Sequence, residues 1–276
     1  MKLAVHIPFY SDPNRVAYLH QVLKSLDGIE ANVDVFVYTN RKNWSIPVLA
    51  NARLVIRNFW CLSRKGPRSR KDYRQPYHRV PRRLRYYLDP FFLTWRNRDY
   101  IEKDLESYDA QMYLEDDLDF NQDTFQYWLQ NRELCNRHDF NLGFLRKELD
   151  ASSSRWFYSD LDRAPENIIT LQGRPFLLND VNSYTGFWIY DRDILREFVK
   201  TPIWRFEFGK YGVREKSAIG WHGIGSTRFK GTVFPLEVSD NSSLRVPGGC
   251  HVHHLPNNYI GHKKFCRVEI PLNVES

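Results

Sequence analysis

Short apolar runs and one helically spaced segment alternate in the N-terminal part of the chain. Three runs predict β-strands, at residues 2–8, 33–38 and 52–56. Between the first two, apolar residues recur at helical spacing over 13–26, with Ser11 or Asp12 as the N-cap and Pro13 at the first helical position. A strand, a helix and a strand in this order predict a parallel α/β sheet.

Further along, the hydrophobic pattern predicts the same two kinds of element. Strands are expected at residues 108–114, 141–149 and 184–190, the last of them aromatic and containing a glycine. Helices are expected at residues 124–134, 191–199 and 213–221, and a buried helix begins after Asp89. The pattern also predicts a polar loop over 152–167 and an irregular tail after Pro247.

The carboxyl ends of the predicted parallel strands are where a ligand is expected, because open α/β sheets bind their ligands there. In this chain those ends are residues 6–10 and 38–40. No G-x-G-x-x-G follows the first strand, and no G-x-x-x-x-G-K-[ST] occurs. The chain therefore lacks the sequence signatures of dinucleotide-binding and P-loop proteins.

Three consecutive carboxylates, Glu115, Asp116 and Asp117, directly follow the predicted strand 108–114. Like charges this close repel one another, and a divalent cation would remove that cost. Carboxylate oxygens completed by water and phosphate oxygens suit Mg²⁺ or Mn²⁺ better than zinc. The alternative is a solvated acidic turn at the start of a helix, where carboxylates are also favourable.

Composition and charge narrow the class of partner. With 276 residues, of which 42% are hydrophobic, the chain can bury a sizeable core, so a globular rather than a disordered chain is expected. The net charge of +7 indicates an anionic partner. Residues 64–98 hold twelve Lys and Arg and leave the rest slightly acidic, which favours a diphosphate over a polymer as the anion. Nucleic-acid binding by this segment stays open, although no helix-turn-helix, RRM or KH signature accompanies it.

Membrane and cysteine patterns indicate a soluble, cytoplasmic protein with reduced thiols. No apolar stretch approaches the roughly 18 residues of a spanning helix, and no signal peptide precedes Pro8. The four cysteines form no C-x-x-C pair. In the tail, a tetrahedral zinc site is one alternative and surface histidines in a loop are another. The residues that would bind zinc are Cys250, His253, His262 and Cys266.

The segment Tyr113–Asp117 resembles the acidic metal motif of GT-A glycosyltransferases, with Glu115 standing where the family more commonly has Asp. Other features resemble that family in the same order and cover nearly the whole chain. They are the strand ending at Pro8, the strand ending at Thr39-Asn40, residues 93–98, the glycine-containing strand 184–190, Arg214-Glu215-Lys216, and the late histidines in 253–259.

The resemblance implies a nucleotide-sugar donor and a Mn²⁺ or Mg²⁺ cofactor. It implies that Asp117 binds the metal directly, while Glu115 and Asp116 face the ribose or bound waters. His254, or otherwise His251 or His253, would be the only nitrogen ligand of the metal. Binding of the nucleotide and its diphosphate would fall to Pro8, Thr39, Asn40 and Arg98.

For an inverting transfer, the base that takes the proton of the acceptor hydroxyl is predicted to be Glu215, with Asp180 in reserve. A glutamate in the first turn of a helix is equally explained by helix stability. Sugar-binding positions are expected among the aromatic and glycine residues beyond 155, although aromatic residues in strands are also common in cores. These positions are Trp156, Tyr184, Gly186, Phe187 and Trp188.

Together these features predict a GT-A-like, Rossmann-type sheet with flanking helices in a single domain. Residues 1–119 would bind the nucleotide sugar, and 120–276 the glycan or glycoconjugate acceptor, with a C-terminal tail contacting metal and phosphate. The chain is similar to the anchorless glycosyltransferases of bacteria and large algal viruses, including their β-xylosyltransferases, which implies a UDP-sugar such as UDP-xylose. The alternatives are nucleic-acid binding through residues 64–98 and a metal-dependent phosphohydrolase.

Overall fold

The computed structural model describes residues 1–40, 47–59, 90–182, 184–206, 212–219, 228–229, 233–238, 244–262, 266 and 268–270. Within them the chain is a mixed α/β protein, as predicted, and its sheets contain antiparallel as well as parallel strand pairs. It forms two compact units. The first unit comprises Met1–Asp116 and Gly186–Gly220, and the second comprises Asp117–Thr185 and Trp221–Ser276. The assignment of nucleotide to 1–119 and acceptor to 120–276 stays a prediction.

The first unit is built on a five-stranded sheet in the order β10-β4-β1-β2-β3. Its strands are β1 (Lys2–Phe9), β2 (Asn32–Thr39), β3 (Arg53–Asn58), β4 (Ala110–Leu114) and β10 (Phe187–Asp191). All neighbours are parallel except β10, which runs antiparallel to β4. The predicted strands of this unit are confirmed. Pro8 lies inside β1 rather than at its end, and pairing with β4 has already stopped at His6.

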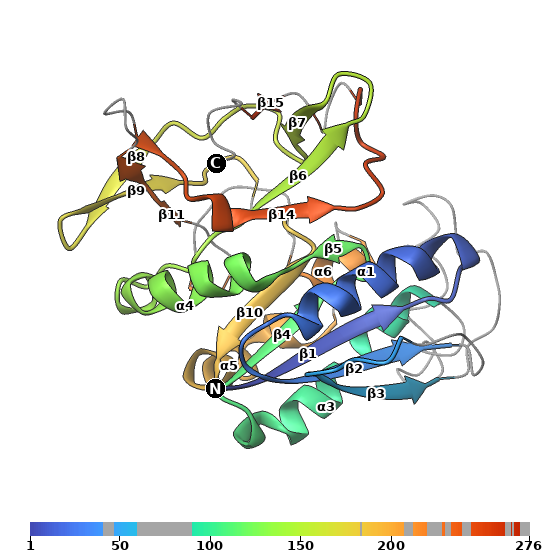
Figure 1. Ribbon diagram of the computed structural model, residues 1–276. Helices are drawn as coiled ribbons and strands as arrows, with labels where there is room; N and C mark the ends of the chain where they lie inside the picture. Colours follow the sequence, from blue (N-terminus) through green and yellow to red (C-terminus); the bar gives the residue numbers. More distant parts are fainter. Residues whose placement is uncertain are drawn as a thin grey trace. The chain divides into compact units, whose positions relative to one another are not determined.

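Helices cover both faces of this sheet (Figure 1). On one face lies α1 (Val16–Asp27), preceded by the 3-10 turn η1 (Pro13–Arg15), whose N-cap is Asp12, as predicted. The buried helix expected after Asp89 is instead two short helices, η4 (Pro90–Trp95) and α3 (Arg98–Lys103). The remaining helices of the unit are η5 (Leu105–Ser107), α5 (Arg192–Phe198), η6 (Pro202–Trp204) and α6 (Val213–Ser217).

The sheet packs against a different layer on each of its two faces, because successive side chains of a strand alternate in direction. Ala4, Phe36 and Tyr38 share one face and form a buried cluster with Leu93 and Tyr108. Because successive side chains of a strand point to opposite faces, the other residues of β2 face the layer of α1. These are Val33, Val35 and Val37, all buried. A two-sided core of this kind is typical of strands with continuous apolar runs.

The order of the strands creates a topological switch point between β1 and β4. From β1 the chain proceeds to β2 and β3 on one side and then returns to β4 on the other. In open α/β sheets the ligand lies outside the carboxyl ends of the two strands at such a point. In this unit those ends are the residues that follow Phe9 and Leu114.

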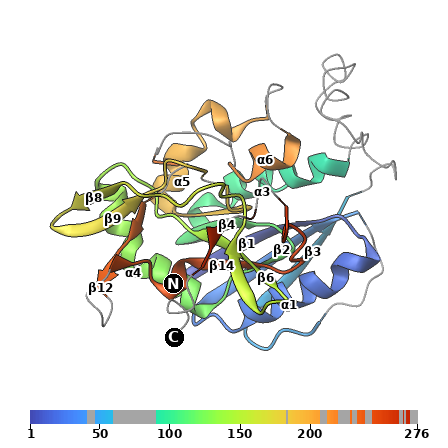
Figure 2. The same ribbon diagram turned by 90° about the horizontal axis from the view of Figure 1, so that it is seen from above.

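The second unit contains one long helix, α4 (Gln122–Arg137), and three sheets. The five-stranded sheet has the order β15-β7-β6-β14-β5 and comprises β5 (Leu118–Asp119), β6 (Leu145–Asp150), β7 (Arg155–Tyr158), β14 (His251–His254) and β15 (Val268–Glu269). The smaller sheets comprise β8 (Ile168–Leu171), β9 (Arg174–Leu178), β11 (Val233–Pro235), β12 (Glu237–Val238) and β13 (Leu244–Arg245). In two views, β8 and β9 lie to one side of β6 and β14 (Figures 1 and 2).

Two predictions for this unit were wrong. Residues 155–158 of the expected polar loop form β7, which pairs with β6 across a turn in which Ser154 has a φ of 55°. The tail expected to be irregular contains β14, preceded by the 3-10 turn η7 (Gly248–Cys250). Because β14 is only four residues long and has three histidines, its conformation comes from pairing with β6 and β5 rather than from propensity.

Other predictions are met in part. Helix α4 and strand β6 differ at their ends from the expected 124–134 and 141–149, and α6 ends at Ser217. Cys135, Cys250 and Cys266 are buried free thiols. None of the helices in the described part of the chain is long and apolar enough to cross a membrane. Residues 60–89, which hold most of the basic segment, lie outside the described residues.

A buried carboxylate in the first unit makes its stability depend on pH. Asp34 on β2 accepts hydrogen bonds from Arg53 Nε and Nη2 at 2.7 and 2.6 Å and from Tyr108 Oη at 2.7 Å. The Arg53 hydrogen bonds lower the pKa of Asp34, burial opposes them, and the Tyr108 hydrogen bond lowers it further. The stabilisation is therefore present at neutral pH and is lost as the pH falls through the folded-state pKa.

We expect the free energy of unfolding of Asp34→Asn to decrease less steeply than that of wild type as the pH is lowered. Urea unfolding, followed from neutral pH to below the usual aspartate pKa of about 3.9, measures this slope. The matched control is Asp162→Asn at an exposed position, which should keep the wild-type slope. Equal slopes for Asp34→Asn and wild type would mean that this carboxylate is not the acid-sensitive group.

Candidate functional site

The first two carboxylates of the triplet lie in the first unit, at the carboxyl end of β4. Glu115 and Asp116 are 3% and 5% exposed. The backbone N–H of Glu115 donates to Gly186 O, which fixes the turn against the start of β10. Arg15 binds the Asp116 carboxylate through both Nε (2.9 Å) and Nη2 (2.5 Å). Glu115 Oε2 forms an ion pair with Arg214 at 3.4 Å.

The pair of Arg15 and Asp116 connects the ends of the two strands at the switch point. Arg15 lies in η1, which follows β1, and Asp116 follows β4. A bidentate arginine–carboxylate pair fixes both groups in orientation as well as in position. The sequence indicated the carboxylate but not Arg15, because a single arginine carries no recognisable pattern, and it did not indicate that Arg214 contacts Glu115.

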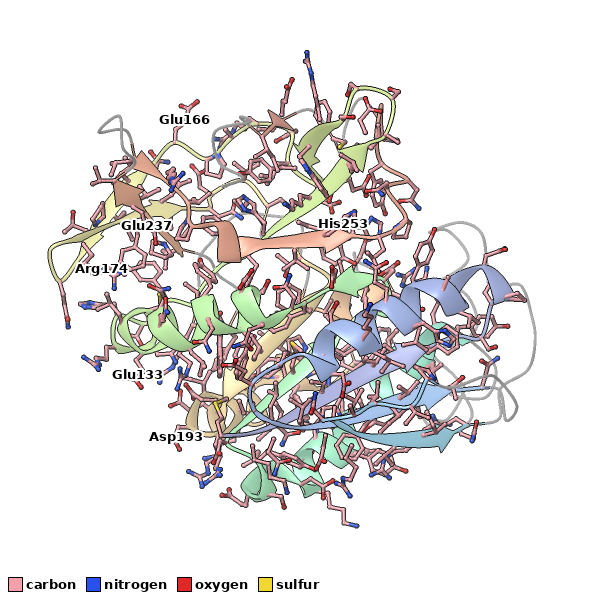
Figure 3. The ribbon with its side chains drawn as sticks, in the orientation of Figure 1. Glu133, Glu166, Arg174, Asp193, Glu237 and His253 are labelled. Atoms are coloured by element: carbon pink, nitrogen blue, oxygen red, sulfur yellow. The ribbon has the colours of Figure 1, made fainter. Side chains whose placement is uncertain are left out.

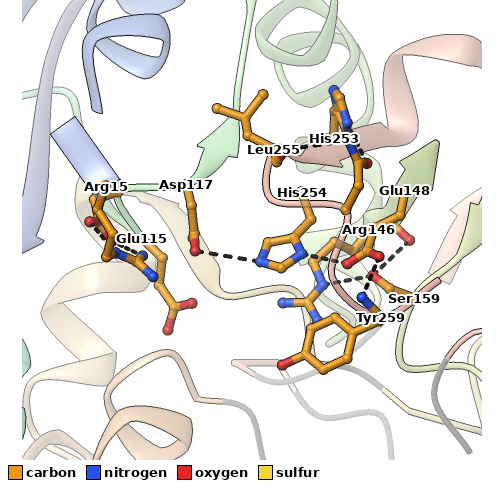
Figure 4. Close-up of polar contacts among 12 residues, drawn as sticks. Arg15, Glu115, Asp117, Arg146, Glu148, Ser159, His253, His254, Leu255 and Tyr259 are labelled. Atoms are coloured by element: carbon orange, nitrogen blue, oxygen red, sulfur yellow. Dashed lines mark hydrogen bonds and ion pairs between the residues drawn. The ribbon is translucent and has the colours of Figure 1, made fainter. Parts of the chain in front are cut away.

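The third carboxylate, Asp117, belongs to the second unit, where it lies beside His254 (Figure 4). Asp117 Oδ2 is 3.4 Å from His254 Nε2, and Glu148 Oε1 is 2.5 Å from His254 Nδ1. The backbone N–H of Leu255 donates to Asp117 O at 3.0 Å, so the two chain segments are also joined by main-chain bonding. The three side chains form a buried carboxylate–histidine–carboxylate row.

The hydrogen bonds of His254 set its electrostatic state. Burial works to lower the pKa of His254, but the contacts with the Asp117 and Glu148 carboxylates raise it, and the net direction is upward. The site therefore favours a positive charge at the histidine, supplied by a proton or by a cation next to the ring.

Further contacts hold Glu148 and the His254 ring in place. Glu148 Oε2 accepts the backbone N–H of Tyr259 at 2.8 Å, and the Tyr259 ring stacks on His254 with centroids 5.5 Å apart. The buried guanidinium of Arg146 lies 5.2 Å from the ring centroids of both Tyr259 and Tyr184. Arg146 also forms an ion pair with Asp160 and donates to Ser159 Oγ at 2.8 Å.

The other two histidines of β14 are engaged elsewhere. His251 Nδ1 donates to Gly248 O at 3.1 Å, which leaves Nε2 to accept from Tyr158 Oη at 3.0 Å. His253 Nε2 is 2.9 Å from Asn257 Oδ1, and its position on β14 is labelled in Figure 3. Since alternate residues of a strand point to opposite faces, His253 and His254 face opposite sides of the sheet. Of the three histidines, His254 is the one that the structure places beside Asp117.

The chemistry of Asp117 and His254 fits a divalent cation. In the described part of the chain, no three His, Cys, Asp or Glu side chains gather as a metal site, and the tetrahedral zinc site considered for the tail is not formed there. One carboxylate oxygen and one imidazole nitrogen suit Mn²⁺ whose other positions are filled by water and phosphate oxygens. A histidine that binds metal generally donates its second ring N–H to a carboxylate, as His254 can to Glu148.

The residues predicted to contact the nucleotide lie near the ends of β1 and β2. Pro8 and Thr39 are buried within those strands. Asn40 Oδ1 accepts the backbone N–H of Ser11 at 2.9 Å and so joins the two loops. Their contact with a nucleotide stays a prediction.

Arg98 has a different environment from the one expected of a phosphate ligand. Its guanidinium is enclosed by aromatic rings and donates to Ser217 O at 2.8 Å. The ring centroids lie between 4.3 and 5.4 Å away and belong to Trp95, Trp188, Phe198 and Trp204. We name these four residues the aromatic box. A cation enclosed in this way stabilises the fold, so the geometry gives the phosphate role of Arg98 no support.

The two candidate bases lie in different units and both make structural contacts. Glu215 Oε2 accepts the backbone N–H of Gly212 at 2.7 Å and caps the start of α6, which was the alternative explanation for this residue. Asp180 accepts from Asn167 Nδ2 at 2.7 Å and forms an ion pair with Arg163 at 3.5 Å. Their role as a base stays a prediction.

The predicted acceptor residues separate into two groups. Trp188 is a core residue that donates to Ser217 O at 3.1 Å, Phe187 is buried, and Gly186 has a φ of 79° that favours glycine. Trp156 is half-buried, with Lys147 Nζ 4.2 Å from its ring centroid. Tyr184 is also half-buried, against Arg146.

Comparison with known proteins adds no assignment to this geometry. No protein-family model matches the chain, and no curated protein matches it either.

Proposed function

We propose that the protein is a metal-dependent glycosyltransferase that moves a sugar from a nucleoside-diphosphate donor to a hydroxyl of a glycan acceptor. The observation that carries the proposal is the row Asp117–His254–Glu148, since it pairs an oxygen and a nitrogen ligand with an outer carboxylate. The sheet of the first unit, parallel except for β10 and with helices on both faces, is compatible with a GT-A-like fold, which is part of this proposal.

Asp117 and His254 would hold the metal ion. When bound, a divalent cation would neutralise the charge of the departing diphosphate as a Lewis acid. The chain itself orients the two ligands: Glu148 holds the histidine ring, and Leu255 N–H holds the backbone of Asp117. Asp116 is held by Arg15, so we assign it to ordering the switch point rather than to binding the metal.

The nucleotide would lie at the carboxyl edge of the first unit's sheet. The switch point between β1 and β4 supports this position, because ligands of open α/β sheets lie there. A UDP-sugar, with UDP-xylose as the first to be tried, is the donor that we propose. The base would be Glu215 or Asp180, the latter in reserve, and the partly exposed rings of Trp156 and Tyr184 are the aromatic surfaces that we propose for the acceptor.

Calorimetric titration with UDP tests the proposal. We expect UDP to bind with micromolar-range affinity in the presence of Mn²⁺ and much more weakly after chelation. Asp117→Asn should remove this metal dependence while the protein stays folded. A screen of nucleotide sugars for metal-dependent turnover then identifies the donor.

Two other outcomes would replace the proposal. Metal-dependent hydrolysis of simple phosphate esters without sugar transfer would indicate a phosphohydrolase that uses the same carboxylates. Salt-sensitive binding of random oligonucleotides, with no binding of UDP at any metal concentration, would indicate a nucleic-acid-binding protein.

A further inference from the structure

We infer that Glu148 is a positioning residue that places the proton of the neutral His254 ring on Nδ1 and so leaves Nε2 to bind a metal ion. This inference rests on the proposed metal site at Asp117 and His254. Glu148 lies on β6 and directly follows Lys147, which pairs with His253 of the parallel strand β14. Strand pairing therefore brings the Glu148 carboxylate and the His254 ring to the same place.

The two contacts of the His254 ring are unequal. Glu148 Oε1 lies 2.5 Å from Nδ1, whereas Asp117 Oδ2 lies 3.4 Å from Nε2. Good N–H···O hydrogen bonds have donor–acceptor distances of about 2.7–3.2 Å, so the contact with Asp117 is longer than such a bond. When the ring of His254 carries a single proton, Glu148 therefore holds that proton on Nδ1, and the Nε2 lone pair faces Asp117.

This arrangement decides whether the site can take a cation. In the other tautomer, Nε2–H would donate to Asp117 Oδ2, and the proton would occupy the space between the two ligand atoms. A lone pair and a carboxylate oxygen that face each other repel, and a cation between them converts this repulsion into two attractive contacts. Glu148 thus selects the tautomer in which Asp117 and His254 can share an ion.

Glu148 is itself held so that it cannot turn away from the ring. Its side chain is 0% exposed, and its second oxygen accepts the backbone N–H of Tyr259 at 2.8 Å. Each carboxylate oxygen thus accepts from a different N–H donor. A glutamine in this position has only one acceptor oxygen, so its NH₂ group would face either the His254 N–H or the Tyr259 N–H.

Mn²⁺ affinity of Glu148→Gln tests the inference without donor or acceptor. Titration followed by the electron paramagnetic resonance of unbound Mn²⁺ should show affinity reduced by roughly 10–100-fold relative to wild type, the usual cost of losing an outer partner of a metal ligand. The matched control is Glu133→Gln, because Glu133 is an exposed glutamate of α4, and it should bind Mn²⁺ as wild type does.

The melting temperature separates positioning from a purely structural role. If Glu148 only stabilised the fold, Glu148→Gln would melt earlier but its folded fraction would bind Mn²⁺ with wild-type affinity, and that result would overturn the inference. Suppose that wild type binds Mn²⁺, that His254→Ala does not, and that Glu148→Gln binds like wild type. The metal site is then supported, and only the role of Glu148 is contradicted. If wild type binds no Mn²⁺, the proposed metal site and the role of Glu148 are both contradicted.

A spectroscopic measurement on the wild-type chain covers the case in which Glu148→Gln does not fold. Long-range ¹H–¹⁵N spectra of the metal-free protein, labelled at histidine and recorded at a pH where His254 is neutral, report which ring nitrogen carries the proton. The signals of His254 are assigned by their absence in His254→Ala. We expect the proton on Nδ1, and a proton on Nε2 would contradict the inference.

Discussion

His254→Ala is expected to weaken Mn²⁺ binding by roughly 100-fold or more, whereas His253→Ala is expected to leave it unchanged. Loss of a direct ligand should exceed the cost of losing an outer partner, which is about 10–100-fold. His254 contacts Asp117, whereas His253 contacts Asn257 and the ring of Trp156. The two variants differ by one position in the same strand.

The comparison of His254→Ala with His253→Ala controls both for damage to the fold and for the loss of one imidazole group. Each variant removes one imidazole from the same four-residue strand, so unspecific damage to β14 would affect both. Isothermal titration with Mn²⁺, together with thermal unfolding of each variant, separates loss of a ligand from loss of structure. Equal Mn²⁺ affinities for both variants would contradict the metal site, and a loss confined to His253→Ala would move the site to the opposite face of the sheet.

The sequence predicted the first unit well because its strands are long and apolar. The runs around Val5, Val35 and Val55 read as strands in isolation, and Asp12 and Pro13 carry an unambiguous helix start. Each of these signals is local. The topology that follows from them, with parallel neighbours and helical crossovers, has few alternatives.

The second unit was harder to predict because its strands depend on their partners. β7 contains only four residues and forms a hairpin with β6, and β5 contains only two and pairs with β14 across a large sequence separation. The same separation hides Glu148, which lies 106 residues before His254 and carries no motif. Acidic clusters and histidine-rich tails are visible in a sequence, but the residue that orients a ligand is found only from the fold.

Arg98 shows the opposite case. Its position in the sequence suggested a phosphate-binding residue, whereas the structure shows a side chain buried in the core. Its position upstream of the acidic triplet matched that of a phosphate ligand, yet the guanidinium lies in the aromatic box. Ser217 O accepts from both Arg98 Nη2 and Trp188 Nε1, so the arginine joins α6 to α3 and the tryptophan joins α6 to β10. Cation–π contacts of a desolvated arginine contribute about 2 kcal/mol or more.

We therefore expect Arg98→Ala to destabilise the protein by about 3 kcal/mol or more, from lost cation–π contacts together with the cavity left by a large buried side chain. For a chain of this size that corresponds to a melting temperature lowered by roughly 6 °C or more. Lys103→Ala, at an exposed position of the same helix α3, is the matched control and should melt as wild type does. Because the loss of folding free energy arises in the core, the folded fraction of Arg98→Ala should bind UDP with wild-type affinity in the presence of Mn²⁺. A variant that melts like wild type but loses UDP binding would instead assign Arg98 to the diphosphate and would mean that the box opens when the nucleotide binds.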